Sequence, residues 1–143
     1  MHQLRISTAV EDQDVDLIHR FLSEESAWAQ GIPVETVRES IEHSLNFGGF
    51  LGSSQVAFAR VVSDYATFAY LVDVFVLQEH RGNGYSATLM SAIVGHPRLQ
   101  GLRRFMLATS SAHGLYERFG FTSPVKPQSL MEKFVPNAYY REV

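Results

Sequence analysis

A long apolar segment that runs into a glycine-rich turn lies in the middle of the chain. Residues 67–77 (TFAYLVDVFVL) are almost continuously apolar, which predicts a central β-strand buried on both faces. The next stretch, QEHRGNGYSATLM, places Gly82 and Gly84 before an apolar pattern that predicts a helix over residues 86–94. A strand, a tight turn and a helix in this order indicate a protein in which helices and strands are mixed.

Hydrophobic periodicity predicts further elements on both sides of this unit. Strands are expected over residues 4–8, 48–53, 55–63, 67–77, 103–110 and 129–136, and helices over residues 14–28, 33–45, 86–94 and 112–120. The expected fold class is therefore mixed α/β, with helices on both faces of one sheet.

Composition limits the functions that are compatible with this fold. The chain has 143 residues, which predicts a single domain over residues 1–143, and it has no cysteine, which excludes disulfides, thiolate metal sites and a cysteine nucleophile. The six histidines show no ligand spacing, so no metal is expected. No apolar stretch approaches the ~20 residues of a membrane span, and a cytoplasmic location without membrane contact is expected. The net charge of −3, without a basic stripe, argues against nucleic acid as a partner.

The glycine-rich turn has the properties of an anion site. Gly82 and Gly84 allow a tight turn and close approach to the amides, and the following helix offers unpaired N–H groups beside the charge of Arg81. A pyrophosphate is the expected occupant. The spacing Gly82-x-Gly84-x-x-Ala87 also fits a dinucleotide fingerprint, but the acidic residue expected ~20 positions later is missing. A turn that needs glycine only for packing is the remaining alternative.

Three segments together resemble the GCN5-related N-acetyltransferase (GNAT) family. They are Val74-Phe75-Val76 at the end of the central strand, residues 81–86 (RGNGYS) at the start of the helix, and residues 115–121 (LYERFGF) in a later short helix. The order of elements from residue 4 to about 135 is also similar to that of the family. The resemblance implies a mostly antiparallel sheet that is splayed at a cofactor groove.

The same resemblance implies acetyl-CoA as co-substrate. Its pyrophosphate is expected on the loop residues Arg81, Gly82, Asn83, Gly84, Tyr85 and Ser86, and its pantetheine arm beside Val74, Phe75 and Val76. Two positions depart from the family pattern. Ser86 replaces a glycine or alanine, and Thr109 replaces an asparagine that contacts pantetheine, so both substitutions are expected to affect cofactor contacts.

Attack of an amine on a thioester needs a neutral amine, a stabilised oxyanion and a proton for the departing thiolate. No covalent enzyme intermediate is required, so direct transfer in a ternary complex suits a chain without cysteine. A backbone N–H near Val76 is a candidate to polarise the thioester carbonyl. Tyr116 lies at the family's position for the acid that protonates the thiolate, and His113 lies three residues earlier on the same helical face.

The sequence does not decide which residue would act as general base, and Asp73 has two interpretations. Asp73 is flanked by apolar residues in the central strand, so it is either a base or a structural hydrogen-bond acceptor. Glu24, Glu25 and Asp64 are alternatives. In this family the loop between the first two helices and the strand hairpins bind the acceptor, which here implies Glu24, Trp28, Tyr65 and Tyr70. Trp28 is equally interpretable as an anchor of the first helix on the sheet.

The sequence therefore predicts an N-acetyltransferase that acts on a primary amine of a small-molecule or peptide acceptor. A non-catalytic acyl-CoA-binding module is the main alternative. The C-terminal stretch PNAYYREV, with Tyr139 and Tyr140, is interpreted either as an interface, as in a homodimer, or as an ordered terminus.

Overall fold

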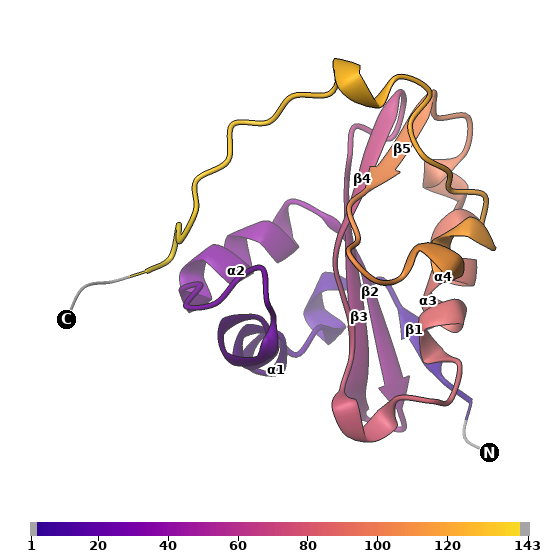
Figure 1. Ribbon diagram of the computed structural model, residues 1–143. Helices are drawn as coiled ribbons and strands as arrows, with labels where there is room; N and C mark the ends of the chain where they lie inside the picture. Colours follow the sequence, from indigo (N-terminus) through magenta and orange to yellow (C-terminus); the bar gives the residue numbers. More distant parts are fainter. Residues whose placement is uncertain (1–2, 141–143) are drawn as a thin grey trace.

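The computed structural model describes residues 3–140 and has a five-stranded sheet at its centre (Figure 1). The strands are β1 (Arg5–Ser7), β2 (Leu45–Leu51), β3 (Ser54–Ser63), β4 (Phe68–Val76) and β5 (Arg104–Leu107). The α-helices are α1 (Val15–Arg20), α2 (Val34–Glu42), α3 (Tyr85–Val94) and α4 (His113–Glu117). Short helical turns are η1 (Val10–Asp12), η2 (Phe21–Glu25), η3 (Gln78–His80), η4 (Pro97–Leu99) and η5 (Pro127–Ser129).

The strands lie in the order in which they follow one another in the chain. Neighbours pair antiparallel from β1 to β4, and only β4 and β5 pair parallel. The mixed, mostly antiparallel sheet expected from the sequence is therefore confirmed. The α3 helix is the crossover that the parallel pair requires.

Helices cover both faces of the sheet, as predicted. Figure 1 shows α1 and α2 on one side and α3 and α4 on the other. The α1–α2 layer buries a cluster in which the rings of Phe21 and Phe75 stack with centroids 4.0 Å apart. The other layer buries Leu89, Met90 and Ile93 of α3 against β2, β3 and β4. Within residues 3–140, no helix is both long and apolar enough to span a membrane.

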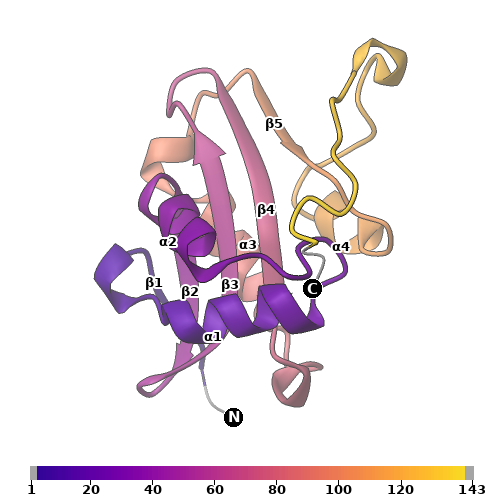
Figure 2. The ribbon, with the colours of Figure 1, turned by 90° about the vertical axis from the view of Figure 1, so that its left-hand side faces the viewer.

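The central position of β4 is confirmed, but its complete burial is not. Buried and half-buried residues alternate along the strand, and Phe68 at its start is 39% exposed. The reason is that α2 lies over the side of the sheet formed by β2 and β3, and leaves the first half of β4 uncovered (Figure 2).

Both helices before β2 end earlier than the periodicity predicts. Asp14 caps α1, where its carboxylate accepts a hydrogen bond from the Leu17 N–H at 3.1 Å, and the last turn before Ser26 widens into the π-type turn η2. The α2 helix ends at Glu42 because Leu45 already belongs to β2. The buried amide of Asn46 donates to the carbonyl of Ile41 at 2.8 Å and so satisfies the end of α2.

The strand predicted over residues 129–136 is wrong for the single chain. Residues 130–136 have no regular structure, and they follow η5 across the molecule toward α2 (Figure 1). The apolar pattern is present, but in this chain it reaches no sheet edge, because Tyr139 packs against the α1–α2 cluster at the opposite side.

We expect Gly48→Ala to destabilise the fold. A Cβ at Gly48 would meet the buried amides of Gln13 and Gln55, whose side chains hydrogen-bond to each other at 3.1 Å. Separating these two amides is expected to cost about 1–3 kcal/mol of unfolding free energy, measurable by urea denaturation. Gly114→Ala is the matched control, because a Cβ there meets nothing within 4 Å and Gly114 lies in α4. Equal unfolding midpoints for the two variants would contradict the analysis.

Candidate active site

The glycine-rich loop between β4 and α3 forms one end of the candidate site. Gly82 and Gly84 have positive φ angles of 83° and 77°, a conformation that residues with a Cβ rarely adopt. The Nε of Arg81 donates to the carbonyl of Val76 at 2.9 Å, and the amide of Asn83 donates to the carbonyl of His80 at 2.9 Å. The first bond ties the loop to the end of β4, and the second fixes the turn within the loop.

The start of α3 and the short helix α4 face each other across this loop. A hollow of about 200 Å³ is lined by Val76, by loop residues, by the first turn of α3, by Leu115 of α4 and by Arg118, which directly follows α4. The ten-residue helix α3 begins at Tyr85, directly after Gly84, so its first N–H groups and the positive end of its dipole lie at the hollow. With Arg81 and Arg118 on the rim, the hollow is suited to a phosphate group.

The edge of β4 beside the hollow is free of β5. The register between the two strands ends at Leu71 opposite Leu107, whereas β4 continues to Val76. Val74, Phe75 and Val76 were predicted to bind pantetheine, and they lie on this splayed part of the strand. Its main-chain groups on the β5 side therefore have no strand partner and are available to an extended ligand.

An extra residue at Asp73 distorts β4 where it leaves β5. Phe58 pairs with Phe75 and Arg60 pairs with Val72, so Asp73 and Val74 together lie opposite Ala59 as a β-bulge. Asp73 has a φ of 58°, in the left-handed region. Its buried carboxylate accepts hydrogen bonds from Trp28 Nε1 at 2.8 Å and from Arg60 Nε at 3.0 Å.

Tyr116 on α4 is the best candidate for a proton donor. Its side chain is buried, and this burial raises the pKa of its phenol above the ordinary value of 10.0. Across residues 3–140, no hydrogen-bond partner is found for its hydroxyl, although the hydroxyl is not enclosed. Tyr116 and His113 both line a groove of about 900 Å³ between β5 and α4. The hydroxyl is thus protonated at neutral pH and accessible.

The two residues that depart from the family pattern have different surroundings. Thr109 uses its side-chain oxygen at the start of α4, where it accepts from the Ala112 N–H at 3.0 Å. Ser86 lies in the first turn of α3 and lines the hollow beside Ala87. The hydroxyl oxygen of Thr109 is therefore already hydrogen-bonded within the loop before α4. Ser86, by contrast, lines the hollow in which the phosphate is expected.

The four predicted acceptor residues do not form one group. Glu24 in η2 is exposed, and Trp28, which is 53% exposed, lies in the connection that follows η2. Tyr70 lies on β4 opposite Val62, on the same face as the Arg60–Asp73 pair. Tyr65 is separate, because it lies in the β3–β4 loop beneath the Arg98 guanidinium, 3.6 Å from its ring centroid.

Of the alternative bases, Asp64 stabilises the β3–β4 loop through hydrogen bonds. Its carboxylate accepts hydrogen bonds from Thr67, Ala66 and Phe68, and these bonds lower its pKa below the ordinary range. Glu25 is exposed in η2. The described residues 3–140 contain no cluster of histidine and acidic side chains that could hold a metal ion.

Sequence reasoning missed Arg60 and Arg118. Arg60 is a charged residue in the apolar strand QVAFARVVS, so its need for a buried partner was visible, but the partner depends on the β3–β4 register. Arg118 lies within LYERFGF, directly after α4, and lines the phosphate hollow. Only the packing of α4 against the loop reveals that position.

Comparison with known proteins agrees with this geometry. The model of the Acetyltransferase (GNAT) family matches residues 12–121, so the chain belongs to this family of acetyltransferases. A crystal structure from Xanthomonas campestris, described as a candidate GNAT acetyltransferase, is 61% identical over 99% of both chains with a TM-score of 0.96.

More distant matches are found in sequence and in structure. A candidate acetyltransferase of Gibberella zeae is 29% identical over 78% of this chain and 74% of its own length. A candidate acetyltransferase of Clostridium acetobutylicum, crystallised with acetyl-CoA, is 14% identical and has a TM-score of 0.68 over 98% of this chain and all of that one.

We expect Asp73→Asn to lower stability through loss of the ion pair with Arg60. Asparagine tolerates the left-handed φ and still accepts from Trp28, so the lost charge is the main change. The expected cost is about 1–3 kcal/mol in urea denaturation. A double-mutant cycle with Arg60→Gln measures the coupling directly. If Asp73 is instead a base, the variant should keep its stability and lose turnover.

Proposed function

We propose that this protein is an acetyl-CoA-dependent N-acetyltransferase that acetylates a primary amine by direct transfer in a ternary complex. The observation that carries the proposal is the convergence of three features. They are a phosphate hollow at the start of α3, a free strand edge on β4, and an accessible tyrosine hydroxyl on α4. Together they provide for the phosphate, the extended arm and the thiolate of acetyl-CoA.

The hollow is suited to the pyrophosphate because it combines main-chain donors with permanent charge. The main-chain amides from Gly82 to Ser86 would hold the phosphate oxygens, whereas the Arg81 N–H already donates to the Gln78 carbonyl at 3.2 Å. The side chains of Arg81 and Arg118 add positive charge. The main chain at Val74 and Val76 would pair with the amides of pantetheine. The bound acetyl-CoA supplies an activated thioester, so the protein itself needs no nucleophile.

The chain's own groups fit the remaining steps. A main-chain N–H beside Val76 is in a position on the strand to polarise an acyl carbonyl. Tyr116 holds a proton through the neutral range because its raised pKa keeps the phenol neutral, and its hydroxyl has room to deliver that proton to a thiolate. The hydrogen bonds that Asp73 accepts from Trp28 and Arg60 favour its interpretation as a structural acceptor over that of a general base. The proton of the amine would then leave through water or through an exposed group such as His113.

The acceptor is proposed to bind on the α1–α2 side of β4. Trp28 presents an exposed ring that its bond to Asp73 holds in place, and Glu24 adds negative charge on the same connection. An aromatic face beside a carboxylate suits a cationic amine. Tyr70 lies on the same sheet face, whereas Tyr65 is on a loop at the other end of β4 from the phosphate hollow. A small-molecule or amino-acid-like amine is therefore the proposed acceptor.

We expect Gly84→Val to abolish binding of acetyl-CoA while the protein still folds. Valine at a φ of 77° strains the loop and places a branch over the amides that would hold phosphate. The thermal shift on adding acetyl-CoA at ~100 times the wild-type dissociation constant should be lost, whereas the wild type gains about 2.7 kcal/mol.

Gly101→Val is the matched control for this experiment. Gly101 also has a positive φ, of 73°, and open space around its Cα, but it lies in the loop before β5. Both variants should lose similar stability, and only Gly84→Val should lose the shift. A normal shift in Gly84→Val would show that the loop does not hold the cofactor.

We expect Tyr116→Phe to retain acetyl-CoA binding and to slow amine acetylation by about 10²–10⁴-fold, because only the acidic proton is removed. Acetylation is followed by release of free thiol across a panel of primary amines. Tyr139→Phe removes a hydroxyl outside the groove and should leave the rate unchanged. If the wild type binds acetyl-CoA and transfers to no amine, the non-catalytic acyl-CoA-binding alternative is favoured.

A further inference from the structure

Arg60 on β3 has hydrogen-bond donors that its own chain does not use. Its Nε donates to the Asp73 carboxylate at 3.0 Å, and its Nη1 donates to the Ser44 hydroxyl at 2.9 Å. Within residues 3–140, no partner is found for Nη2, and this atom is not enclosed. Only 16% of the side chain is exposed. A permanent positive charge is therefore fixed at two points and keeps a third nitrogen, with two N–H donors, open to a ligand.

The chemistry of this nitrogen favours a carboxylate. Guanidinium donors form their strongest hydrogen bonds with carboxylate and phosphate oxygens. Because Asp73 already balances the charge of Arg60, a ligand group with one negative charge is better matched than a phosphate with two. The phosphate hollow is also a separate place, lined by Arg81 and Arg118. The bonds to Asp73 and Ser44 hold the guanidinium in place before a ligand arrives, so little further ordering of its side chain is needed.

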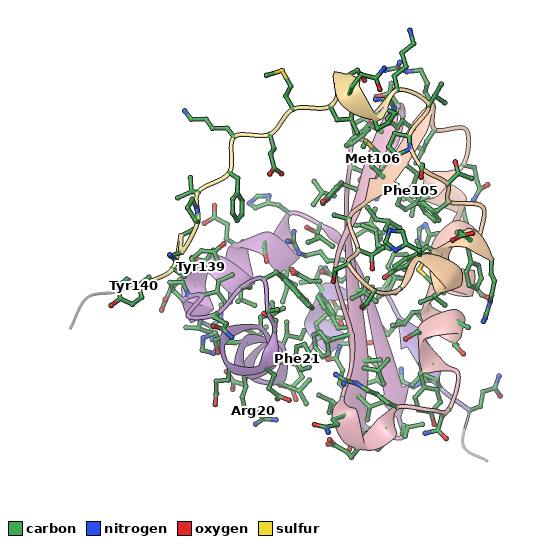
Figure 3. The ribbon with its side chains drawn as sticks, viewed as in Figure 1. Arg20, Phe21, Phe105, Met106, Tyr139 and Tyr140 are labelled. Atoms are coloured by element: carbon green, nitrogen blue, oxygen red, sulfur yellow. The ribbon has the colours of Figure 1, made fainter. Side chains whose placement is uncertain are left out.

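The sheet face beside Arg60 is apolar and partly uncovered. Arg60 and Val62 point to the same face, because side chains alternate along a strand, and Val62 lies opposite Tyr70 of β4. Val62 is 44% exposed, because α2 does not reach this part of the sheet (Figure 2). Met106 of β5 lies opposite Tyr70, and Figure 3 shows it at the end of the sheet away from Phe21 of the α1–α2 layer. An apolar group bound next to Arg60 would therefore find exposed surface to cover.

We propose that the acceptor is an apolar α-amino acid and that Arg60 binds its carboxylate. The strands β3 and β4 run antiparallel, so Val62 and the end of β4 lie in opposite directions from Arg60 along the sheet. The side chain of the amino acid would cover Val62 and Tyr70, and its amino group would point past Trp28 toward the end of β4. The inference rests on the proposed function and narrows it, because it makes Arg60 the residue that selects among primary amines.

The acetyl transfer to such a substrate is balanced without a further reactant. The neutral amino nitrogen bonds to the acetyl carbonyl carbon, and the carbon–sulfur bond breaks. The thiolate takes the proton of Tyr116, the nitrogen loses a proton to water, and Tyr116 regains its proton from water. The products are an N-acetyl amino acid and free CoA. The carboxylate takes no part in these steps, so the bond to Arg60 acts by orienting the amine.

The first test measures binding without acetyl transfer. Trp28 is the only tryptophan of the chain, and its bond to Asp73 places its indole next to the partner of Arg60, so its fluorescence reports on this site. Leucine should change the fluorescence at a concentration about 10–100-fold lower than leucinamide or 3-methylbutylamine, which lack the carboxylate but keep the amine and the apolar side chain. Glycine, which keeps the carboxylate without a side chain, should also bind more weakly than leucine.

Two positions are substituted to test the residues. Arg60→Gln should remove the preference for leucine over leucinamide, and circular dichroism establishes that the variant is folded. Val62→Asp covers the case in which Arg60→Gln unfolds, because Val62 is exposed. The new carboxylate would repel that of leucine and should weaken its binding by about 10-fold relative to Val62→Asn, the neutral variant of the same shape. By contrast, 3-methylbutylamine should not bind Val62→Asp more weakly than Val62→Asn, because it has no carboxylate.

Acetylation then tests whether the bound amino acid is the acceptor. With acetyl-CoA, kcat/KM should be about 10–100-fold higher for leucine than for 3-methylbutylamine in the wild type, and this difference should disappear in Arg60→Gln. Equal affinity for leucine, leucinamide and 3-methylbutylamine, or equal acetylation of leucine and 3-methylbutylamine, overturns the inference. Carboxylate-dependent binding without transfer to any amine confirms the site at Arg60 and overturns the transferase instead, so the two failures are distinguishable.

Discussion

The hydrogen-bonded Asp73 holds the distortion on which the arrangement of the site depends. A left-handed residue in the middle of a strand is costly, and here the bonds from Arg60 and Trp28 offset that cost. The extra residue reverses which side chains of β4 face each layer. Leu71 before it and Val76 after it both pack toward α3, whereas Phe75 packs against Phe21 on the other side. The ion pair therefore lies at the bulge that directs β4 side chains into both cores, close to the point where pairing with β5 ends.

The divergence of β4 from β5 brings the groups of the site together. Pairing with β5 stops at Leu71, so the last residues of β4 have no strand partner on the β5 side. The side chain of Arg81 ties the following loop to the carbonyl of Val76, so the start of α3 lies next to the end of β4. A fully paired strand would have no room for an extended ligand between the phosphate loop and Tyr116. The groups of the candidate site thus come from segments that lie far apart in the sequence.

The features that could be predicted from the sequence are those with a local cause. Glycines that need a positive φ mark the turn before α3, and the apolar run marks β4, because each property belongs to one short segment. The bond between Asp73 and Arg60 could not be predicted, because it depends on strand register. The sequence indicated only that Asp73, between apolar neighbours, was either a base or a structural hydrogen-bond acceptor. The early end of α2 has the same origin, since Asn46 acts as a cap only after β2 has formed.

The C-terminal segment, residues 122–140, shows how a failed prediction can carry information. Strand propensity in SLMEKFVP and the exposure of Phe134 disagree in the single chain, whereas natural sequences usually agree across levels of structure. A mismatch between local propensity and observed structure is expected where a segment is selected for binding a partner and not for packing within its own chain. The open edge of β5 is the complementary conflict, because an unprotected strand edge invites association. Tyr116 lines the groove that follows this edge, so the uncovered edge of β5 and the candidate proton donor share one surface of the molecule.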